Sequence, residues 1–215
     1  GGNAPDAIYA FELPAPRNVT LQLSAGRNQY AQLSLLSGCG RSPTPTTLKC
    51  DAASTITYTS YQLPAGRYYV AVESYDPLAF TLQARFSAPT PPPTGDVCAD
   101  PIVLTANTPR VVAGSAFEND YALSCYSAGS DGAFRFDVAS RSDVMLDVRA
   151  GAGEYFGVAL QSTCGERMGE RACTAAANPR AFALSLDPGR YYALVKNGRG
   201  ADYTVTLRTF PPVAT

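Results

Sequence analysis

The 215-residue chain contains no histidine. That absence excludes zinc-protease motifs of the H-E-x-x-H type, Ser-His-Asp triads and Cys-His dyads. Lysine is scarce as well, since only Lys49 and Lys196 occur and neither belongs to an S-x-x-K motif. Carboxylate pairs such as Glu118 with Asp120 lie in polar stretches, where solvated charges are expected. We therefore predict that the chain is not an enzyme and has no catalytic residues.

Charge is sparse and evenly balanced. Charged residues make up 16% of the chain, and 17 basic side chains stand against 18 acidic ones for a net charge of −1. No stretch concentrates Lys or Arg, so nucleic acid is not an expected partner. No run of about 18 apolar residues is present, so no membrane insertion is expected. Residues 1–5 lack the basic and apolar regions of a signal peptide, and we interpret the chain as a mature or excised soluble fragment.

The six cysteines, an even number, are arranged as neighbouring pairs along the sequence. Six cysteines permit fifteen pairings, but pairing each with its neighbour needs only local closures and repeats in both halves of the chain. Metal binding by the thiolates is the alternative, and the lack of C-x-x-C spacing disfavours it. Disulfides imply an oxidising compartment. The predicted structural disulfides are Cys39 with Cys50, Cys98 with Cys125, and Cys164 with Cys173.

An internal repeat organises the chain. Residues 6–40 match residues 131–165 at a shift of 125, through aromatic and alternating apolar positions and a shared Cys-Gly. The shift then becomes 123, because the stretch between cysteines is two residues shorter in the second copy. Residues 63–69 (LPAGRYY) match residues 186–192 (LDPGRYY) in this register. One insertion inside a predicted surface loop is what a duplication produces.

Each copy has the two-residue period of β-strands. Apolar and polar residues alternate over residues 19–23 and again over residues 144–148. Turn signals at Gly66 and Gly189 separate short strands, and no segment sustains a helical stripe. We predict an all-β fold of two tandem β-sandwich modules, jelly-roll or immunoglobulin-like, joined by a Pro-rich linker.

The predicted linker is residues 88–95 (APTPPPTG). Its proline content favours an extended polyproline II strut that holds the modules apart. The predicted first module spans residues 1–87 and the second spans residues 96–210. A proline-containing tail follows at residues 211–215.

The two copies differ in length. The second carries an additional N-terminal stretch that includes Cys98, residues 102–104, residues 110–112 and Cys125, and the first copy has no counterpart to it. The first sandwich is therefore predicted to lack one or two strands, which leaves open sheet edges that must be covered. Either upstream sequence was cleaved, disordered or omitted, or a neighbouring molecule donates the strands.

The turns and closing strands carry a family resemblance. Residues 63–72 (LPAGRYYVAV), the closing strand at residues 80–82 (FTL) and the closing strand at residues 203–205 (YTV) resemble the bacterial pre-peptidase C-terminal domain family. The chain is similar to the cysteine-bearing versions that occur in tandem. The resemblance implies small secreted β-sandwiches with non-catalytic roles, as appendages of secreted hydrolases or as adhesive and spacer modules of surface proteins.

Some members of that family bind calcium through acidic loops. In this chain the corresponding loop keeps only Asp51 in the first copy and has Thr174 in the second, which departs from the family pattern. No stretch spells the D-x-D-x-D-G calcium loop. We predict no cofactor, and calcium is the only ion left open. The carboxylates considered for it are Asp96, Asp100, Glu118, Asp120 and Asp131.

Two tyrosines form a candidate contact face. If Tyr68 and Tyr191 point into the cores, then Tyr69 and Tyr192 point outward. Outward aromatic rings are used to bind sugars and also in contacts between modules or subunits. A ring on the outer sheet face that loops partly cover is the simpler interpretation.

The predicted function is a non-catalytic structural or adhesive module of an extracellular or surface-exposed bacterial protein. It could form part of a fibre or other repetitive assembly that strand donation completes. The alternatives are an accessory domain pair of a secreted peptidase or other hydrolase, and a carbohydrate-binding module. The expected partners are proteins or copies of the same chain, with glycans as a further option.

Overall fold

The computed structural model describes residues 6–26, 29–39 and 45–212. The chain is all-β, with 57% of its residues in strands and 3% in helix. It divides into two compact units, residues 1–91 and 92–215, and the division falls inside the proline-rich stretch. The described helices are single 3₁₀ turns, and none is long and apolar enough to cross a membrane.

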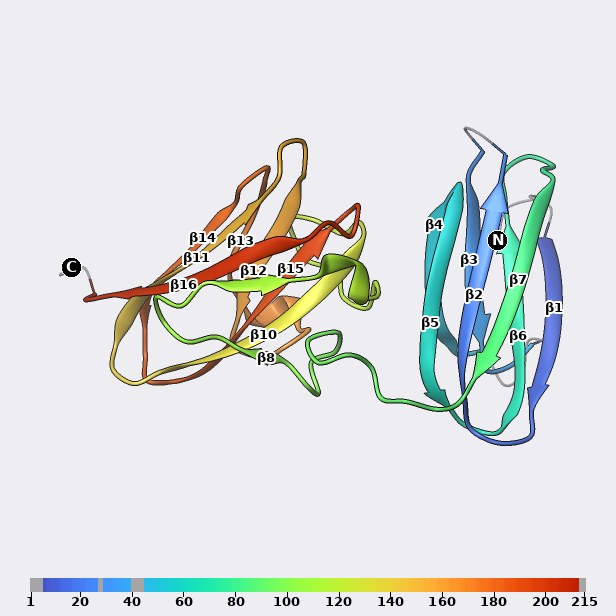
Figure 1. Ribbon diagram of the computed structural model, residues 1–215, viewed down its shortest axis with the longest axis horizontal. Coiled ribbons are helices and arrows are strands. Elements are labelled where there is room, and N and C mark those ends of the chain that lie inside the picture. Colours follow the sequence, from blue (N-terminus) through green and yellow to red (C-terminus); the bar gives the residue numbers. More distant parts are fainter. Residues whose placement is uncertain (1–5, 27–28, 40–44, 213–215) are drawn as a thin grey trace. The chain divides into compact units, whose positions relative to one another are not determined.

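The first unit is a sandwich of two antiparallel sheets (Figure 1). Its strands within the described residues are β1 (Asp6–Leu13), β2 (Arg17–Ala25), β3 (Ala31–Leu36), β4 (Thr47–Ala53), β5 (Thr55–Leu63), β6 (Gly66–Glu73) and β7 (Phe80–Ser87). One sheet has the order β1-β6-β3-β4 and the other the order β5-β2-β7.

Alternation along each strand builds the core of this unit. Val19, Leu21 and Leu23 of β2 point inward and are almost fully buried, as the two-residue period predicts. Tyr68 is also buried, and its hydroxyl donates a hydrogen bond to the Pro64 carbonyl at 2.9 Å. Because the side chains of both sheets meet along this layer, the sandwich holds one continuous hydrophobic core.

The second unit repeats this sandwich with additional strands. Its strands within the described residues are β8 (Ile102–Val103), β9 (Arg110–Val112), β10 (Ser130–Val138), β11 (Ser142–Ala150), β12 (Phe156–Gln161), β13 (Glu170–Ala176), β14 (Arg180–Leu186), β15 (Gly189–Asn197) and β16 (Tyr203–Phe210), with 3₁₀ turns η1 (Gly114–Ala116) and η2 (Arg167–Gly169). The sheet orders are β13-β12-β15-β10-β8 and β14-β11-β16-β9.

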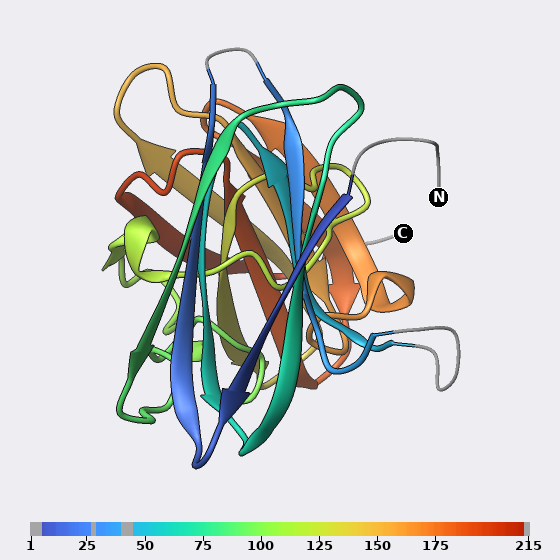
Figure 2. The same ribbon diagram turned by 90° about the vertical axis from the view of Figure 1, so that its right-hand side faces the viewer.

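The strands of the two units correspond one to one. At the repeat shifts, β1 to β7 align with β10 to β16, and both units connect these seven strands in the same order. The additional strands β8 and β9 each lie at the edge of a sheet, beside β10 and β16. The corresponding strands of the first unit, β1 and β7, are edge strands in the described part of the chain. Figure 2 turns the first unit toward the viewer and shows β1 in dark blue.

Both ends of the predicted linker are bound to their own units. The Thr90 N–H donates to Asn18 Oδ1 at 3.2 Å, and Asn18 Nδ2 donates to Thr90 Oγ1 at 2.8 Å. The Gly95 carbonyl accepts a hydrogen bond from the Ala133 N–H at 2.6 Å. The Pro93 carbonyl and the Thr94 hydroxyl are hydrogen-bonded within the second unit as well, to Asp96 and Asp100. Of residues 90–95, only Pro91 and Pro92 therefore lack such an anchor among the hydrogen bonds of the described chain. Of the predicted tail, residues 213–215 lie outside the described residues, as does Gly40 of the repeat.

Candidate functional site

In the second unit, residues 95–129, here called the covering segment, close the outer edge of β10. β8 pairs with β10 in parallel, and the Leu104 N–H donates to the Arg135 carbonyl at 2.8 Å. The Ala133 N–H donates to Gly95, and the Asp131 N–H donates to the Glu118 carbonyl at 2.8 Å. On alternate β10 residues, the backbone N–H and C=O groups that point away from β15, here called the outward groups, are therefore hydrogen-bonded to the covering segment.

The same segment closes the other sheet. β9 pairs with β16 in antiparallel register, with Tyr203 opposite Val112. Further along the strand, the Asn107 N–H donates to the Leu207 carbonyl at 2.8 Å. The outer edges of β10 and β16 are therefore both paired, and the short strands β8 and β9 take the edge positions of the two sheets.

The covering segment also crosses the outer face of the sheet that contains β10. Leu123 is buried there against Ala133, Ala159 and Leu194. Tyr126 lies against β12 so closely that a Cβ placed on Gly157 would lie 2.3 Å from the Tyr126 Cβ. The absence of a side chain at Gly157 therefore lets the segment pack directly on the sheet.

Two disulfides fasten the covering segment to that face, and they differ from the predicted pairing. The bridges join Cys98 to Cys164, with a Cα–Cα distance of 5.6 Å, and Cys125 to Cys173, with a distance of 5.8 Å. The predictions of Cys98 with Cys125 and of Cys164 with Cys173 are wrong. The reason is spatial: because the segment crosses the sheet, each of its cysteines meets a cysteine of the module body.

The predicted bridge between Cys39 and Cys50 is also wrong, since both thiols are free and exposed. Cys50 stands opposite Ser34 in the ladder, and Ser34 Oγ lies 3.3 Å from Cys50 Sγ. At the repeat shifts, Cys39 and Cys50 correspond to Cys164 and Cys173. They are therefore the two cysteines whose counterparts bond to the covering segment.

A buried ion pair anchors residues 119–121 of the covering segment. Lys196 Nζ lies 2.7 Å from Asp131 Oδ2, and both side chains are fully buried. Lys196 also donates to Asn119 Oδ1 at 2.9 Å and to the Tyr121 carbonyl. Burial raises the pKa of Asp131, and the Lys196 ammonium with the N–H groups of Asp120 and Tyr121 opposes that rise.

In the described part of the first unit no segment covers the corresponding surface, and we call this surface the open side. It comprises the outer edges of β1 and β7 and the outer face of the sheet that holds β1. Ile8, Tyr9 and Phe86 are 57%, 46% and 49% exposed. The counterparts of Ile8 and Tyr9 in the second unit are Ala133 and Phe134, which have no exposure at all. An apolar surface is therefore buried in one unit and open to solvent in the other.

Aromatic rings line the gap between the two open edges. The rings of Tyr9 on β1 and Phe80 on β7 meet edge to face at a centroid distance of 6.5 Å. The rings of Phe11 and Phe86 lie 5.3 Å apart in a tilted contact. These contacts link β1 to β7 across the layers, so aromatic side chains connect the two open edges.

Charge also differs between the two units. Asp131 faces Lys196 across β10 and β15, whereas Asp6 faces Glu73 across β1 and β6. The open side thus places two exposed carboxylates where the second unit has a neutralised pair. A segment that covered them without a cation would bury uncompensated negative charge.

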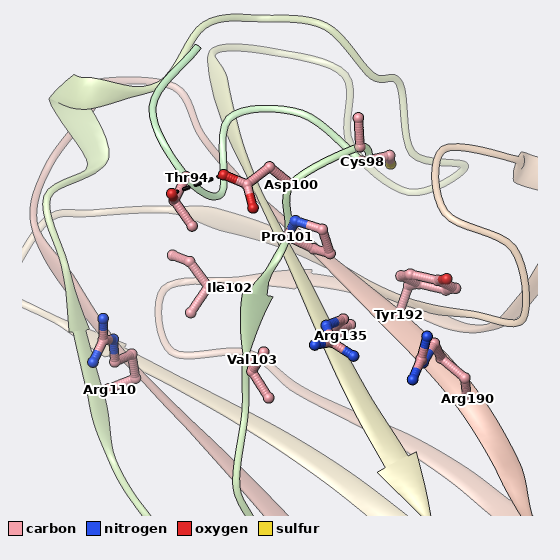
Figure 3. A pocket seen from close by; sticks show the side chains of 11 residues that line it. Thr94, Cys98, Asp100, Pro101, Ile102, Val103, Arg110, Arg135, Arg190 and Tyr192 are labelled. Carbon is pink, nitrogen blue, oxygen red and sulfur yellow. Dashed lines mark hydrogen bonds between the residues drawn. The ribbon is translucent and has the colours of Figure 1, made fainter. Parts of the chain in front are cut away.

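The second unit has an arginine-lined hollow of about 760 Å³ beside Tyr192 (Figure 3). Arg110, Arg135 and Arg190 contribute their guanidinium groups, and Asp100 lies at the opposite side, held by Thr94 Oγ1 at 2.8 Å. Arg190 Nε lies 3.0 Å from an oxygen of Asp137, and its pKa is raised chiefly by that hydrogen bond. The excess of guanidinium over carboxylate suits an anionic group.

Tyr69 and Tyr192 both point away from the cores, as the alternation predicts, but the residues around the two rings differ. Tyr69 and Tyr192 are half-buried and lie outside the cores that contain or contact Tyr68 and Tyr191. The Arg67 guanidinium lies 5.6 Å from the centroid of the Tyr69 ring, so the Tyr69 face is already partly covered. Only Tyr192 lines the hollow.

The carboxylates considered for calcium do not converge. Asp96 accepts a hydrogen bond from the Glu118 N–H at 2.6 Å, and Asp131 is bound to Lys196. Within the described ranges, no three Cys, Asp or Glu side chains gather closely enough to hold a metal ion. Asp131 accepts hydrogen bonds from Lys196 and from the N–H groups of Asp120 and Tyr121, so it organises the covering segment.

Sequence reasoning missed the buried Lys196 and the grouping of arginines. Lys196 follows five apolar or aromatic residues in one strand, and this apolar context was the available signal. Its pairing with Asp131 follows from the register of β10 and β15 in the structure. The arginines come from β9, β10 and β15, and no local pattern connects these strands. Their grouping follows only from the fold.

No family model matches the chain, and no curated protein matches it. Among solved structures, the PBSX exported protein XepA is similar over 96% of this chain and 85% of its own chain. Its sequence identity is 12% and the TM-score is 0.29. A likeness of that size carries no conclusion about this chain.

Proposed function

We propose that the protein is a non-catalytic structural or adhesive module of an extracellular or surface protein, and that its first sandwich accepts strands from another polypeptide segment. The observation that supports this function is the open side. The second unit shows the same sandwich in its closed form, with β8 and β9 in place. The two disulfides indicate an oxidising compartment, as secreted proteins encounter.

The backbone N–H and C=O groups needed for strand addition are already in position on β1. The outward groups of Ala133 and Arg135 bond to the covering segment, and at the repeat shift their counterparts are Ile8 and Ala10 on β1. Each added backbone hydrogen bond contributes about 0.5–1.5 kcal/mol. Burying an exposed side chain such as Ile8 contributes about 1.5–3 kcal/mol. A donated segment that bonds to both edges repeats these gains at several residues, and they act against an association cost of about 4–15 kcal/mol.

A peptide tests this function directly. Residues 95–129, synthesised with Cys98→Ser and Cys125→Ser, are titrated into the intact chain and followed by fluorescence anisotropy. We expect saturable binding, and none for a scrambled peptide of the same composition. The chain variant Ala10→Pro should abolish it, because it removes an outward N–H at an exposed edge position where proline is tolerated. Equal binding of both peptides, or binding that Ala10→Pro leaves unchanged, contradicts the proposal.

The arginine-lined hollow favours a second function, contact with an acidic glycan. An outward Tyr192 ring packs against sugar CH groups, and Arg135 and Arg110 suit a carboxylate or sulfate substituent. Binding of an acidic oligosaccharide should weaken at least tenfold in Tyr192→Ala, an effect of about 1.4 kcal/mol. Tyr69→Ala is the matched control and should leave the affinity unchanged. Equal losses in both variants contradict a site at the hollow.

A further inference from the structure

The two free cysteines of the first unit occupy positions whose counterparts in the second unit form disulfides. Cys164 and Cys173 both bond to the covering segment, to Cys98 and Cys125 respectively. Their counterparts Cys39 and Cys50 are free and exposed. Both attachment points are therefore present in the first unit without the segment they would hold.

The local geometry of these positions is preserved between the units. Cys50 stands opposite Ser34 on β3, as Cys173 stands opposite Ala159 on β12. Cys39 follows the end of β3 as Cys164 follows the end of β12. Because ladder position fixes the face on which a side chain lies, the Cys50 thiol is on the outer face that the covering segment crosses in the second unit.

We propose that the segment filling the open side carries two cysteines, spaced like Cys98 and Cys125, and is joined to Cys39 and Cys50 by two disulfides. This inference rests on the proposed function. The donor is a polypeptide segment outside the 215 residues, since the other four cysteines of the chain are bonded to one another. The first sandwich is then a covalent attachment site.

Formation of each bridge is a two-electron oxidation. One thiol of the chain and one thiol of the donor lose their protons and are joined as a disulfide. A disulfide oxidant of the glutathione type accepts the two electrons and is reduced to two thiols, taking up the two protons. The strand contacts hold the reacting sulfurs together, which favours this mixed disulfide over other pairings.

The charges of the open side add a further requirement for the donor. In the second unit, Lys196 neutralises Asp131 and binds Asn119 of the covering segment. In the first unit, Glu73 replaces that lysine and faces Asp6. The donor therefore supplies the cation, at the position that Asn119 occupies.

The test uses the intact chain and a reduced peptide of residues 95–129 with Asn119→Lys, incubated in a buffer of oxidised and reduced glutathione. Peptide mapping by mass spectrometry without reduction should show Cys39 joined to the peptide's first cysteine and Cys50 to its second. Both free thiols of the chain should be lost together. The chain variant with Cys39→Ser and Cys50→Ser should form no adduct, and the peptide with the original Asn119 should react more slowly.

Three results would overturn the inference: closure of Cys39 onto Cys50, capping by glutathione alone, or reversed bridges. The cysteine-free peptide, in its original and Asn119→Lys forms, separates this failure from that of the proposed function. If a cysteine-free form binds and the cysteine peptide forms no bridges, strand addition stands and covalent attachment is wrong. If none of the peptides binds or reacts, both proposals are wrong.

Discussion

At the residue scale, the ammonium of Lys196 is the best example of a side chain held entirely by protein groups. It lies among Asp131, Asn119 and the Tyr121 carbonyl, without exposure to solvent. A buried charge of this kind is retained only when each of its donors has an acceptor. The pair thus ties residues 119–121 of the covering segment to the sheet.

Lys196→Met should destabilise the second unit by about 3–5 kcal/mol, because it leaves the Asp131 carboxylate buried without its counterion. Guanidinium unfolding of the intact chain measures the loss. Arg190→Ala is the control: it removes a partner from the exposed pair with Asp137 and should leave the transition unchanged. Equal effects of the two substitutions would show that Lys196 is not in a buried pair.

Tyr203 predicts a dependence of stability on alkaline pH. Burial raises the pKa of its phenol far above the usual 10. The native state keeps the proton while the unfolded state releases it, so the free energy of unfolding falls as pH rises above about 10.

Tyr203→Phe should reduce that fall and should cost nothing at neutral pH, because the hydroxyl has no hydrogen-bond partner among the described residues. Part of the fall should remain, because burial also raises the pKa of Tyr68 and Tyr121. Urea unfolding between neutral and alkaline pH compares the variants. Tyr75→Phe, at a position 94% exposed, is the control and should keep the slope of the parent chain. If Tyr203→Phe also keeps that slope, another group is responsible.

Side-chain directions at this scale followed from the sequence, while buried polar contacts did not. Alternation correctly assigned Tyr68 to the core and Tyr69 to the outer face. A period of two says which face a residue occupies, but not what covers that face. The burial of Lys196 depends on the covering segment, which comes from a distant part of the chain.

At the element scale, the covering segment pairs with β10 in one sheet and with β16 in the other, and so holds the two sheets together. β8 and β9 are short, and their pairings with β10 and β16 involve few residues. Two disulfides compensate for this limited pairing by fixing the segment near both of its ends. The stability of the closed sandwich should therefore depend strongly on the bridges.

Removal of one bridge tests that dependence. The double variant of Cys125→Ser with Cys173→Ser should lose about 4 kcal/mol by the loop-entropy relation, since the bridge closes a separation of 48 residues. The matched double variant, Cys39→Ser with Cys50→Ser, should unfold like the parent chain. If that second variant is destabilised instead, Cys39 and Cys50 are paired in solution.

The sequence predicted the strands well but not how they are joined. The two-residue period correctly indicated an all-β sandwich fold. The described part of the first copy contains no counterparts of β8 and β9, while strands missing from the whole first module stay a prediction. Nearest-neighbour pairing of cysteines failed because it assumes that a bridge closes a local hairpin. The actual bridges follow the path of the covering segment over the sheet, which the spacing of Cys98 and Cys125 does not encode.

At the scale of the whole molecule, one chain contains a closed and an open version of the same sandwich. The shared strand order shows that the open version is not a different fold. The difference is confined to the covering segment and the surface it protects. A module of this kind is suited to joining polypeptides, since strand addition provides both backbone bonds and an apolar contact.

Amide hydrogen exchange of the intact chain tests the central claim, that the first sandwich is open and is closed by a donated segment. The account predicts that the outward amides of Ile8 and Ala10 exchange much faster than those of Ala133 and Arg135. It also predicts that the cysteine-free peptide slows exchange in β1 and β7 and leaves β10 and β16 unchanged. Equal protection of both pairs before any peptide is added, or no change in β1 and β7 afterwards, would contradict it.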